Sequence, residues 1–258
     1  MSHRYTQVLA GLRTADLLPA SHECVFVSGS VVRGWGNPTS DLDLHVISAE
    51  PWTGGESSHV ALDPGTLRHE GAFVDGVRWD VEYWLGGQIE QLLEKVSWKS
   101  FEADHAVWKS LSPAEIGMLE RLPYAVAVAG ADRLHEVRER LRSSAHRSVF
   151  VSYALDMADS YTEDAAGQCA TGDLHSAVLT ARLAFEHAVD ALLAGHGQFG
   201  SKWPKWRARR WQEANPAVMT FEEFWSLATM RTFDPADPRA WVEQVIAACQ
   251  KIFMEVDV

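Results

Sequence analysis

The first half of the chain mixes short apolar runs with turn residues, a pattern that predicts strands alternating with helices. Strands are predicted where residues are continuously apolar or alternate between apolar and polar, at 24–27, 41–47, 67–74 and 77–84. Asp75-Gly76, a dipeptide typical of tight hairpins, joins the last two. A helix is predicted over about residues 5–18, and the pattern turns helical again from Gly87. Residues 51–58, rich in Gly, Ser and Pro, predict a loop.

The second half of the chain has the 3.6-residue apolar periodicity of amphipathic helices. Helices are predicted over residues 131–159, 173–194, 221–229 and 238–255. We find no internal repeat. The chain is therefore predicted to be an α+β protein with two domains, a mixed domain of strands and helices over residues 1–120 and a helical domain over residues 121–258.

Composition narrows the class of protein further. The chain has 258 residues, 47% of them apolar, which is enough for a buried core. No apolar stretch approaches the ~18 residues of a membrane span, and the N-terminal segment lacks the apolar centre of a signal peptide. Cys24, Cys169 and Cys249 are widely spaced and form no disulfide framework, as is typical of a reducing compartment. We expect a soluble, cytoplasmic protein.

The charge of the chain bears on its partners. The formal net charge is −12, and such an acidic chain disfavours binding to nucleic acid, which needs a basic surface. Residues 201–210 oppose this trend, since they include five basic residues and no acidic one. An acidic protein with one concentrated basic segment favours a small anionic ligand over a long polyanion.

The residues that carry chemistry begin at Gly29-Ser30, where the first predicted strand ends. A Gly-Ser step between a strand and a helix can direct backbone N–H groups and a hydroxyl at a phosphate. The spacing from Gly29 to Gly34 matches the glycines of a P-loop, but Trp35 stands where the lysine must be, so a P-loop is excluded. On its own, a Gly-Ser step is more often an ordinary turn.

Two carboxylates follow at the second predicted strand. Asp41 and Asp43 are two residues apart, so both side chains leave the same face of the strand. Neighbouring carboxylates repel unless a cation lies between them, and Mg²⁺ is the cation that binds a few carboxylates together with phosphate oxygens. The same pattern also occurs on solvated edge strands, so the pair alone leaves both interpretations open.

A third acid favours the metal interpretation. The strand predicted at residues 77–84 carries Asp80 and Glu82 on one face and Val81 and Tyr83 on the other. Three carboxylates on neighbouring strands can hold two divalent ions about 3.5–4 Å apart, which is the geometry for in-line displacement at phosphorus.

This arrangement resembles a known family. Gly29-Ser30, then Asp41-x-Asp43 after ten intervening residues, then a later strand with a third acid resemble the DNA polymerase β nucleotidyltransferase superfamily. The resemblance covers roughly residues 24–84 and is greatest to the small-molecule branch, which includes the aminoglycoside (streptomycin/spectinomycin) adenylyltransferases. It implies a nucleotidyltransferase domain, with a mixed sheet and flanking helices, followed by a C-terminal helical bundle.

The resemblance also implies roles for individual residues. Gly29 and Ser30 correspond to residues that contact the nucleotide phosphates, and Asp41 and Asp43 to ligands of two Mg²⁺ ions. Asp80 corresponds to the third metal ligand, because it lies in an apolar-Asp-apolar strand like that of the family. Glu82 faces the same way and could share or take this role, so the choice between the two stays open.

The helical half resembles the family at a second point. In the streptomycin/spectinomycin adenylyltransferases the bundle closes over the nucleotide and supplies a lysine shortly after a long helix. Lys202 follows the helix predicted at 173–194 in a comparable place, so the resemblance implies that it contacts the triphosphate. A solvated basic segment is the alternative, and we expect Arg207, Arg209 and Arg210 to lie mostly on the surface.

The reaction implied is transfer of a nucleoside monophosphate, AMP from ATP, to a hydroxyl of a small molecule such as an aminoglycoside-like antibiotic, with release of pyrophosphate. Most acids on helix surfaces are merely solvated, but a cationic acceptor could be received by acids of the predicted helices, namely Asp156, Asp159, Glu186 and Asp190.

Two other functions stay open. An antitoxin-type nucleotidyltransferase that adenylylates a partner protein has the same motif, although those proteins are usually much shorter and lack a fused bundle of this size. A non-catalytic nucleotide-binding module would keep the fold, but the intact Gly-Ser step and acids argue against decay. RNA-tailing enzymes share the motif as well, and the net charge of −12 disfavours a long polyanionic acceptor.

Overall fold

The computed structural model describes residues 6–258, and the chain divides into two compact units. The first unit comprises the residues up to 103 together with 109–146, and the second comprises 104–108 together with 147–258. The first unit continues past residue 120 because a strand at residues 126–129 pairs with its sheet. Where the chain divides into functional domains stays a prediction.

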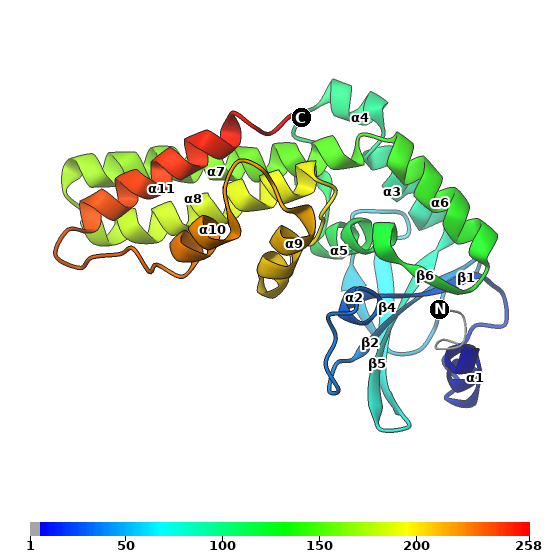
Figure 1. Cartoon of the computed structure of the whole chain (residues 1–258). Coiled ribbons are helices and arrows are strands. Elements are labelled where there is room, and N and C mark those ends of the chain that lie inside the picture. The colour runs from blue at the N-terminus through cyan, green and yellow to red at the C-terminus, as the bar shows by residue number, and fades with distance from the viewer. Residues whose placement is uncertain (1–5) are drawn as a thin grey trace. The chain divides into compact units, whose positions relative to one another are not determined.

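A six-stranded mixed sheet forms the centre of the first unit (Figure 1). The strands are β1 (His22–Ser28), β2 (Leu42–Ser48), β3 (Glu56–His59), β4 (Thr66–Val74), β5 (Val77–Leu85) and β6 (Val126–Ala129). Their order in the sheet is β3-β4-β5-β2-β1-β6. Only β2 and β5 pair in parallel; the other neighbours are antiparallel. The α+β class with a mixed sheet is thus confirmed.

Helices and short 3₁₀ turns connect these strands. They are α1 (Thr6–Thr14), α2 (Gly29–Val32), α3 (Gly86–Lys95), α4 (Trp98–Ala103), η2 (Val107–Ser110), α5 (Pro113–Arg121), η3 (Leu122–Tyr124) and α6 (Ala131–Ser143). Helix α5 begins with a capping box, in which the Ser112 side chain accepts from the Glu115 N–H and the Glu115 side chain accepts from the Ser112 N–H.

The two faces of the sheet differ in chemistry. On one face, α1 packs on apolar side chains of β1, β2 and β5, and Leu12, Leu44 and Val81 are buried there. Side chains alternate along a strand, so Asp43 and Glu82, each next to one of these apolar residues, project from the opposite face. The alternation that predicts half-buried strands therefore also brings acids of β2 and β5 to one side of the sheet.

All four predicted strands are present, with ends that differ by at most two residues from the prediction. Asp75 and Gly76 both have positive φ, 49° and 78°, as the tight hairpin between β4 and β5 requires. The sequence pattern does not predict β3, which lies partly in the segment predicted as a loop, or β6. Each has only four residues, and each owes its conformation to pairing with a distant strand.

Two predicted helices differ from those observed. The prediction over residues 131–159 corresponds to α6 and the start of α7 (His146–Thr171), because Ser144 has extended backbone and its hydroxyl accepts from the His146 N–H at 3.1 Å. The prediction over residues 5–18 begins outside the described residues, and α1 ends at Thr14, since Asp16 adopts a left-handed φ of 56°.

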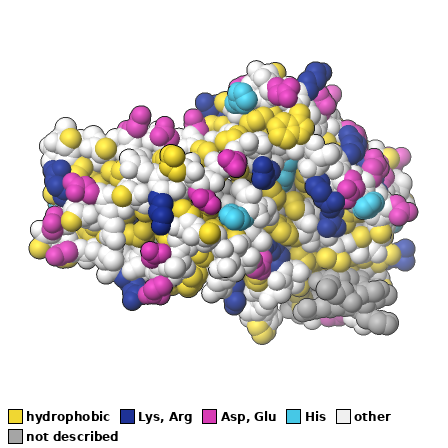
Figure 2. Space-filling view, turned by 45° about the horizontal axis from the view of Figure 1, so that its top comes forward, with side chains coloured by type: hydrophobic (Ala, Val, Ile, Leu, Met, Phe, Trp, Pro, Cys, Tyr) yellow, Lys and Arg dark blue, Asp and Glu magenta, His cyan; other side chains and the backbone are white. Residues whose placement is uncertain are grey.

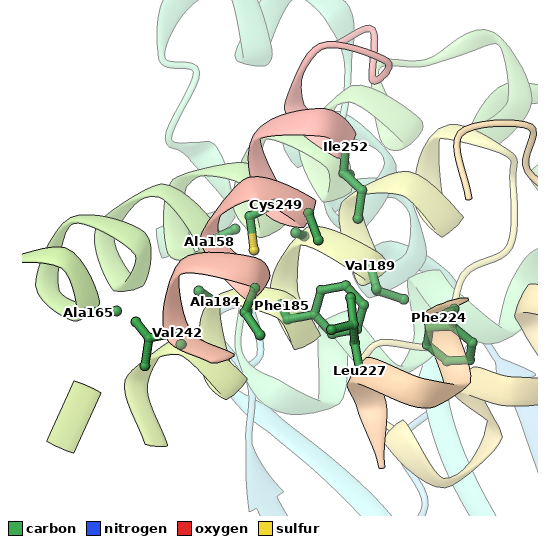
Figure 3. Packing of buried hydrophobic residues seen from close by; sticks show 14 of the residues in the cluster. Ala158, Ala165, Ala184, Phe185, Val189, Phe224, Leu227, Val242, Cys249 and Ile252 are labelled. Atoms are coloured by element: carbon green, nitrogen blue, oxygen red, sulfur yellow. The ribbon is translucent and has the colours of Figure 1, made fainter. Parts of the chain in front are cut away.

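The second unit is helical. Besides α7 it contains α8 (Leu174–Gly195), η4 (Pro204–Trp206), α9 (Arg207–Ala214), α10 (Phe221–Ala228) and α11 (Pro238–Phe253). Small residues such as Ala158, Ala165 and Ala184 let α7, α8 and α11 approach closely, and larger side chains of α8 and α10 fill the remaining core (Figure 3). Among residues 6–258, no helix is both long and apolar enough to cross a membrane.

Candidate functional site

Gly29, the first residue of α2, follows β1 directly and lies beside Asp43 of β2. Its φ is +77°, a conformation that glycine adopts without strain. A Cβ at this position would collide with the Asp43 carboxylate, so a glycine is required by both the backbone and the neighbouring acid. The Gly-Ser step and the Asp-x-Asp pair, read as separate motifs in the sequence, therefore form one site, with Ser30 next in α2.

The register of the sheet decides which acids are neighbours. β2 and β5 run parallel, with Asp43 opposite Asp80 and His45 opposite Glu82. Asp41 lies one residue before β2. The structure thus brings Gly29, Asp43 and Asp80 together and places Glu82 one step further along the strand.

Arg121, at the end of α5, joins two of the acids. Its Nη2 donates to Asp43 Oδ1 at 2.7 Å, and its Nη1 donates to Glu82 Oε1 at 3.3 Å. The Arg121 side chain is 15% exposed, compared with 20% for Asp43 and 27% for Glu82. Nothing in the sequence around residue 121 signals this role, because the contact spans 78 residues and depends on how α5 packs.

Glu82 has further partners that fix it in place. The Trp84 indole Nε1 donates to its Oε2 at 3.2 Å, and His45 Nδ1 lies 3.3 Å from the same oxygen. Ser28 Oγ and His45 Nε2 are 2.8 Å apart, and both residues are buried. Burial alone would raise the pKa of Glu82, but His45, Arg121 and Trp84 lower it to about 2. Glu82 is therefore held as an anion by neighbours on several elements.

The pKa of Asp43 is shifted in the opposite direction to that of Glu82. Burial raises the pKa of the Asp43 carboxyl above its ordinary value, and the nearby charges of Asp41 and Glu82 raise it further. Arg121 and His45 act in the other direction without cancelling this effect. A half-buried carboxylate surrounded by other acids is stabilised by an additional cation.

Carboxylates are the ligands that a hard divalent cation prefers. Asp43 and Asp80 lie opposite each other on β2 and β5, so both are placed to bind the same ion. In the present arrangement, however, guanidinium groups engage both, Arg121 at Asp43 and Arg78, whose Nε is 3.0 Å from Asp80 Oδ1. Within residues 6–258, no three Asp, Glu, His or Cys side chains form a group that could hold a metal ion as they stand. Metal binding at these acids would require the arginines to give way.

The basic segment of the second unit differs from the expectation. Lys202 and Lys205 are exposed, on either side of the start of η4. Arg207 and Arg210, predicted to lie on the surface, are instead 14% and 1% exposed in their side chains. This prediction is wrong because α9 turns both arginines toward a buried acid of α8; Arg209 is exposed, as predicted.

That acid is Asp190. Arg207 donates to it from Nε at 3.1 Å and Nη2 at 2.9 Å, and Arg210 from Nη2 at 2.8 Å. Burial would raise the pKa of Asp190, but the two arginines lower it below its ordinary value. Glu186 is likewise paired, with Arg182 and Arg207. Neither acid is therefore available to a cationic acceptor, whereas Asp156 and Asp159 are exposed on α7.

Comparison with known proteins supports the fold. The chain is similar in structure to a nucleotidyltransferase-like protein from Exiguobacterium sibiricum 255-15, with a TM-score of 0.52 and 10% sequence identity, over 98% of this chain and 75% of that one. No family model and no curated protein matches the sequence. At this identity the similarity shows a nucleotidyltransferase-like fold, and the chemistry has to be argued from the site.

Proposed function

We propose that the protein is a nucleotidyltransferase that transfers a nucleoside monophosphate, AMP from ATP, to a hydroxyl of a small molecule. The observation that carries this proposal is the junction of β1, β2 and β5, where Gly29 lies against Asp43 and Asp43 is in register with Asp80. At this turn the backbone lies directly against a carboxylate, with no side chain between them, so N–H groups of the turn and acids of two parallel strands could act on one phosphate. The fold shared with a nucleotidyltransferase-like protein supports the same conclusion.

In the proposed reaction the acceptor hydroxyl oxygen forms a bond to the α-phosphorus, and the bond from that phosphorus to the bridging oxygen of the β-phosphate breaks. Pyrophosphate leaves and the hydroxyl proton is released. Gly29 and Ser30 would contact the phosphates, and Asp41, Asp43 and Asp80 would hold Mg²⁺. When bound, Mg²⁺ would activate the hydroxyl and neutralise charge on the leaving pyrophosphate.

The chain's own residues have separate tasks in this scheme. When Arg121 gives way to a metal at Asp43, Glu82, which is fixed by His45 and Trp84, would retain the guanidinium, so the scheme does not use Glu82 as a metal ligand. Lys202 would contact the triphosphate. The acceptor would be a small molecule, with an aminoglycoside-like antibiotic as one class, because the chain is acidic overall and Figure 2 shows basic side chains interspersed with acidic ones on the face it displays.

A non-catalytic nucleotide-binding module is the second candidate, and the Arg121–Asp43 ion pair favours it. A guanidinium that permanently replaced the metal would leave nucleotide binding without transfer. Calorimetric titration with Mn²⁺ distinguishes the candidates. For the transferase we expect binding to the wild type and tighter binding to Arg121→Met, since the competing cation is removed. In a module the wild type would not bind Mn²⁺, and binding would occur at most in Arg121→Met, where the acids are freed.

The activity is tested with purified protein, Mg²⁺ and each NTP labelled at the α-phosphate, in the presence of a panel of aminoglycosides and related amino sugars. We expect pyrophosphate release with transfer of label to one acceptor class, with ATP as the donor. Asp43→Asn is the control for contaminating activity. Labelling of a partner protein instead of a small molecule would favour the antitoxin-type function, and absence of transfer to any acceptor would contradict the proposal.

A further inference from the structure

A pocket of about 280 Å³ lies within the helical unit, among α8, η4, α9, α10 and α11, and has no part in the proposed reaction. Its apolar wall includes Phe185, Val189, Phe224, Leu227 and Trp241, each at most 6% exposed. Four of these side chains are labelled in Figure 3, where α8 and α10 bring them together. An apolar cavity of roughly 150 Å³ can accommodate benzene, so this pocket has room for a substituted ring.

Three charged side chains, Arg182, Glu186 and Arg207, add polar groups to the lining. Arg182 donates to Glu186 from Nε at 3.2 Å, and within the described residues its terminal Nη groups have no partner. Arg207 and the buried Arg210 both bind Asp190. Three arginines thus face two carboxylates, and this cluster favours one additional negative charge.

Trp241 provides a second, independent observation. It lines the pocket and is 2% exposed, yet its indole Nε1 has no hydrogen-bond partner within residues 6–258. Buried polar groups are almost always hydrogen-bonded, so an orphaned indole N–H beside a cavity indicates a missing acceptor. Nε1 is itself covered, so an occupant of the pocket would reach it only after the wall rearranges.

We propose that this pocket binds a small aromatic monocarboxylate. The ring would pack against Phe185, Phe224 and Trp241, since aromatic side chains favour contacts with other rings. The carboxylate would accept hydrogen bonds from the Arg182 terminal nitrogens, and a polar atom of the ligand would accept from Trp241 Nε1. The inference rests on the second unit alone and does not depend on the proposed transferase activity.

The test uses the full-length protein labelled with ¹⁵N and three probes of similar size: phenylacetate, phenylacetamide and 2-phenylethylammonium. The Trp241 indole signal is identified as the one lost in Trp241→Phe. We expect phenylacetate to shift this signal saturably, the neutral amide to bind about tenfold more weakly, as loss of one charge-assisted hydrogen bond predicts, and the cation to bind more weakly still.

Variants locate the site. Arg182→Met should weaken phenylacetate binding about tenfold while leaving the amide unchanged, and Ala228→Phe, which fills the pocket, should abolish both. Arg231→Met is the matched control, because Arg231 is similarly exposed, 55% against 52%, and does not line the pocket. The other indole signals report whether each variant is folded. No saturable shift of the Trp241 signal with any probe, equal effects of the two arginine variants, or preference for the cation would overturn the proposal.

Discussion

Each unit of the molecule contains a cluster of arginine and carboxylate, and the two clusters differ in electrostatic balance. In the second unit, Asp190 is 4% exposed and binds both Arg207 and Arg210. In the first unit, Asp43 is 20% exposed, and its one ion pair within residues 6–258 is with Arg121, which it shares with Glu82. The pKa of Asp190 is lowered, whereas the pKa of Asp43 is raised.

This difference separates a structural ion pair from a candidate reactive site. Two guanidinium groups fully satisfy Asp190, so it has no capacity for a ligand. Asp43 lies among acids with too few cations, a condition that costs stability and persists where a site needs charge for function. Two arginine–carboxylate ion pairs of similar length can thus differ in role. The burial of the carboxylate and the charges around it distinguish them.

The largest effect is expected for Asp43→Asn. We expect at least about a 10³-fold loss of transfer activity, since a carboxylate that binds the metal is replaced by a neutral amide. The melting temperature should hold or rise, because the substitution relieves repulsion with Asp41 and Glu82. Steady-state kinetics and thermal unfolding measure both. Asp75→Asn, in the exposed turn between β4 and β5, is the control. Substantial activity at saturating Mg²⁺ would rule out the metal site.

The variants Asp80→Ala and Glu82→Ala distinguish a metal ligand from a residue that positions its neighbours in the first unit. For Asp80→Ala we expect about a 10³-fold loss of activity with little change in stability. Glu82→Ala should cost only about tenfold in activity but about 2 kcal/mol in unfolding free energy, because buried His45 loses the carboxylate beside it and Arg121 loses one of the two carboxylates that it binds. Kinetics and urea unfolding of both variants provide the answer. The reverse order of activities would make Glu82 the third metal ligand.

Asp190→Asn tests the other cluster. It should destabilise the protein by about 3 kcal/mol at pH 7, because buried Arg210 loses its counter-charge and Arg207 loses one of the two carboxylates that it binds. The pKa of Asp190 in the folded protein lies below the unfolded value of about 3.9. The ionised form therefore contributes stability above that pH, and the contribution is lost as the pH falls through the folded pKa.

Urea unfolding of wild type and Asp190→Asn, from pH 7 down to the lowest pH at which the wild type stays folded, measures this difference. The gap between the two proteins should narrow below about pH 3.9. Asp164→Asn, at an exposed position of α7, should match the wild type throughout. If Asp190→Asn were as stable as the wild type, the second cluster would not be structural and the contrast with Asp43 would fail.

The sequence predicts the parts of the fold that are decided locally. Strands β1, β2, β4 and β5 have alternating or continuous apolar patterns, and the Asp75-Gly76 hairpin has its own turn chemistry. The sequence does not predict strand β6, because that strand depends on pairing with β1. It also does not predict the break between α6 and α7, because the break depends on the side chain of Ser144. The motif Gly29-Ser30 with Asp41 and Asp43 indicates the candidate site through its resemblance to a known family, since neither part is specific on its own.

The arginine partners of the acids could not be predicted from the sequence. Arg121 reaches Asp43 across 78 residues of sequence, and Arg210 reaches Asp190 across 20, with no periodicity that links either pair. A basic segment such as residues 201–210 looks the same in sequence whether its arginines are solvated or buried. Only the packing of α9 on α8 shows that Arg207 and Arg210 turn inward. Charge pairing between elements is a property of tertiary structure.

The last prediction concerns Lys202 and asks whether the second unit contributes to the reaction as well as to stability. Lys202 and Lys205 form a closely matched pair, since both are exposed and each ammonium lies 5.6 Å from the ring of the following tryptophan. Their exposure and their tryptophan contacts do not distinguish them; the resemblance to the adenylyltransferases singles out Lys202. If Lys202 contacts the triphosphate, Lys202→Ala should raise the KM for NTP and lower kcat, with a loss in kcat/KM of about 10²-fold.

Lys205→Ala should have a smaller effect, and Mn²⁺ binding to the nucleotide-free protein should stay unchanged in both variants, since neither lysine is a metal ligand. Steady-state kinetics of the two variants beside the wild type decides the matter. Equal, near-wild-type kinetics would mean that the lysines are solvated, and the basic character of this segment would then serve only the buried cluster around Asp190.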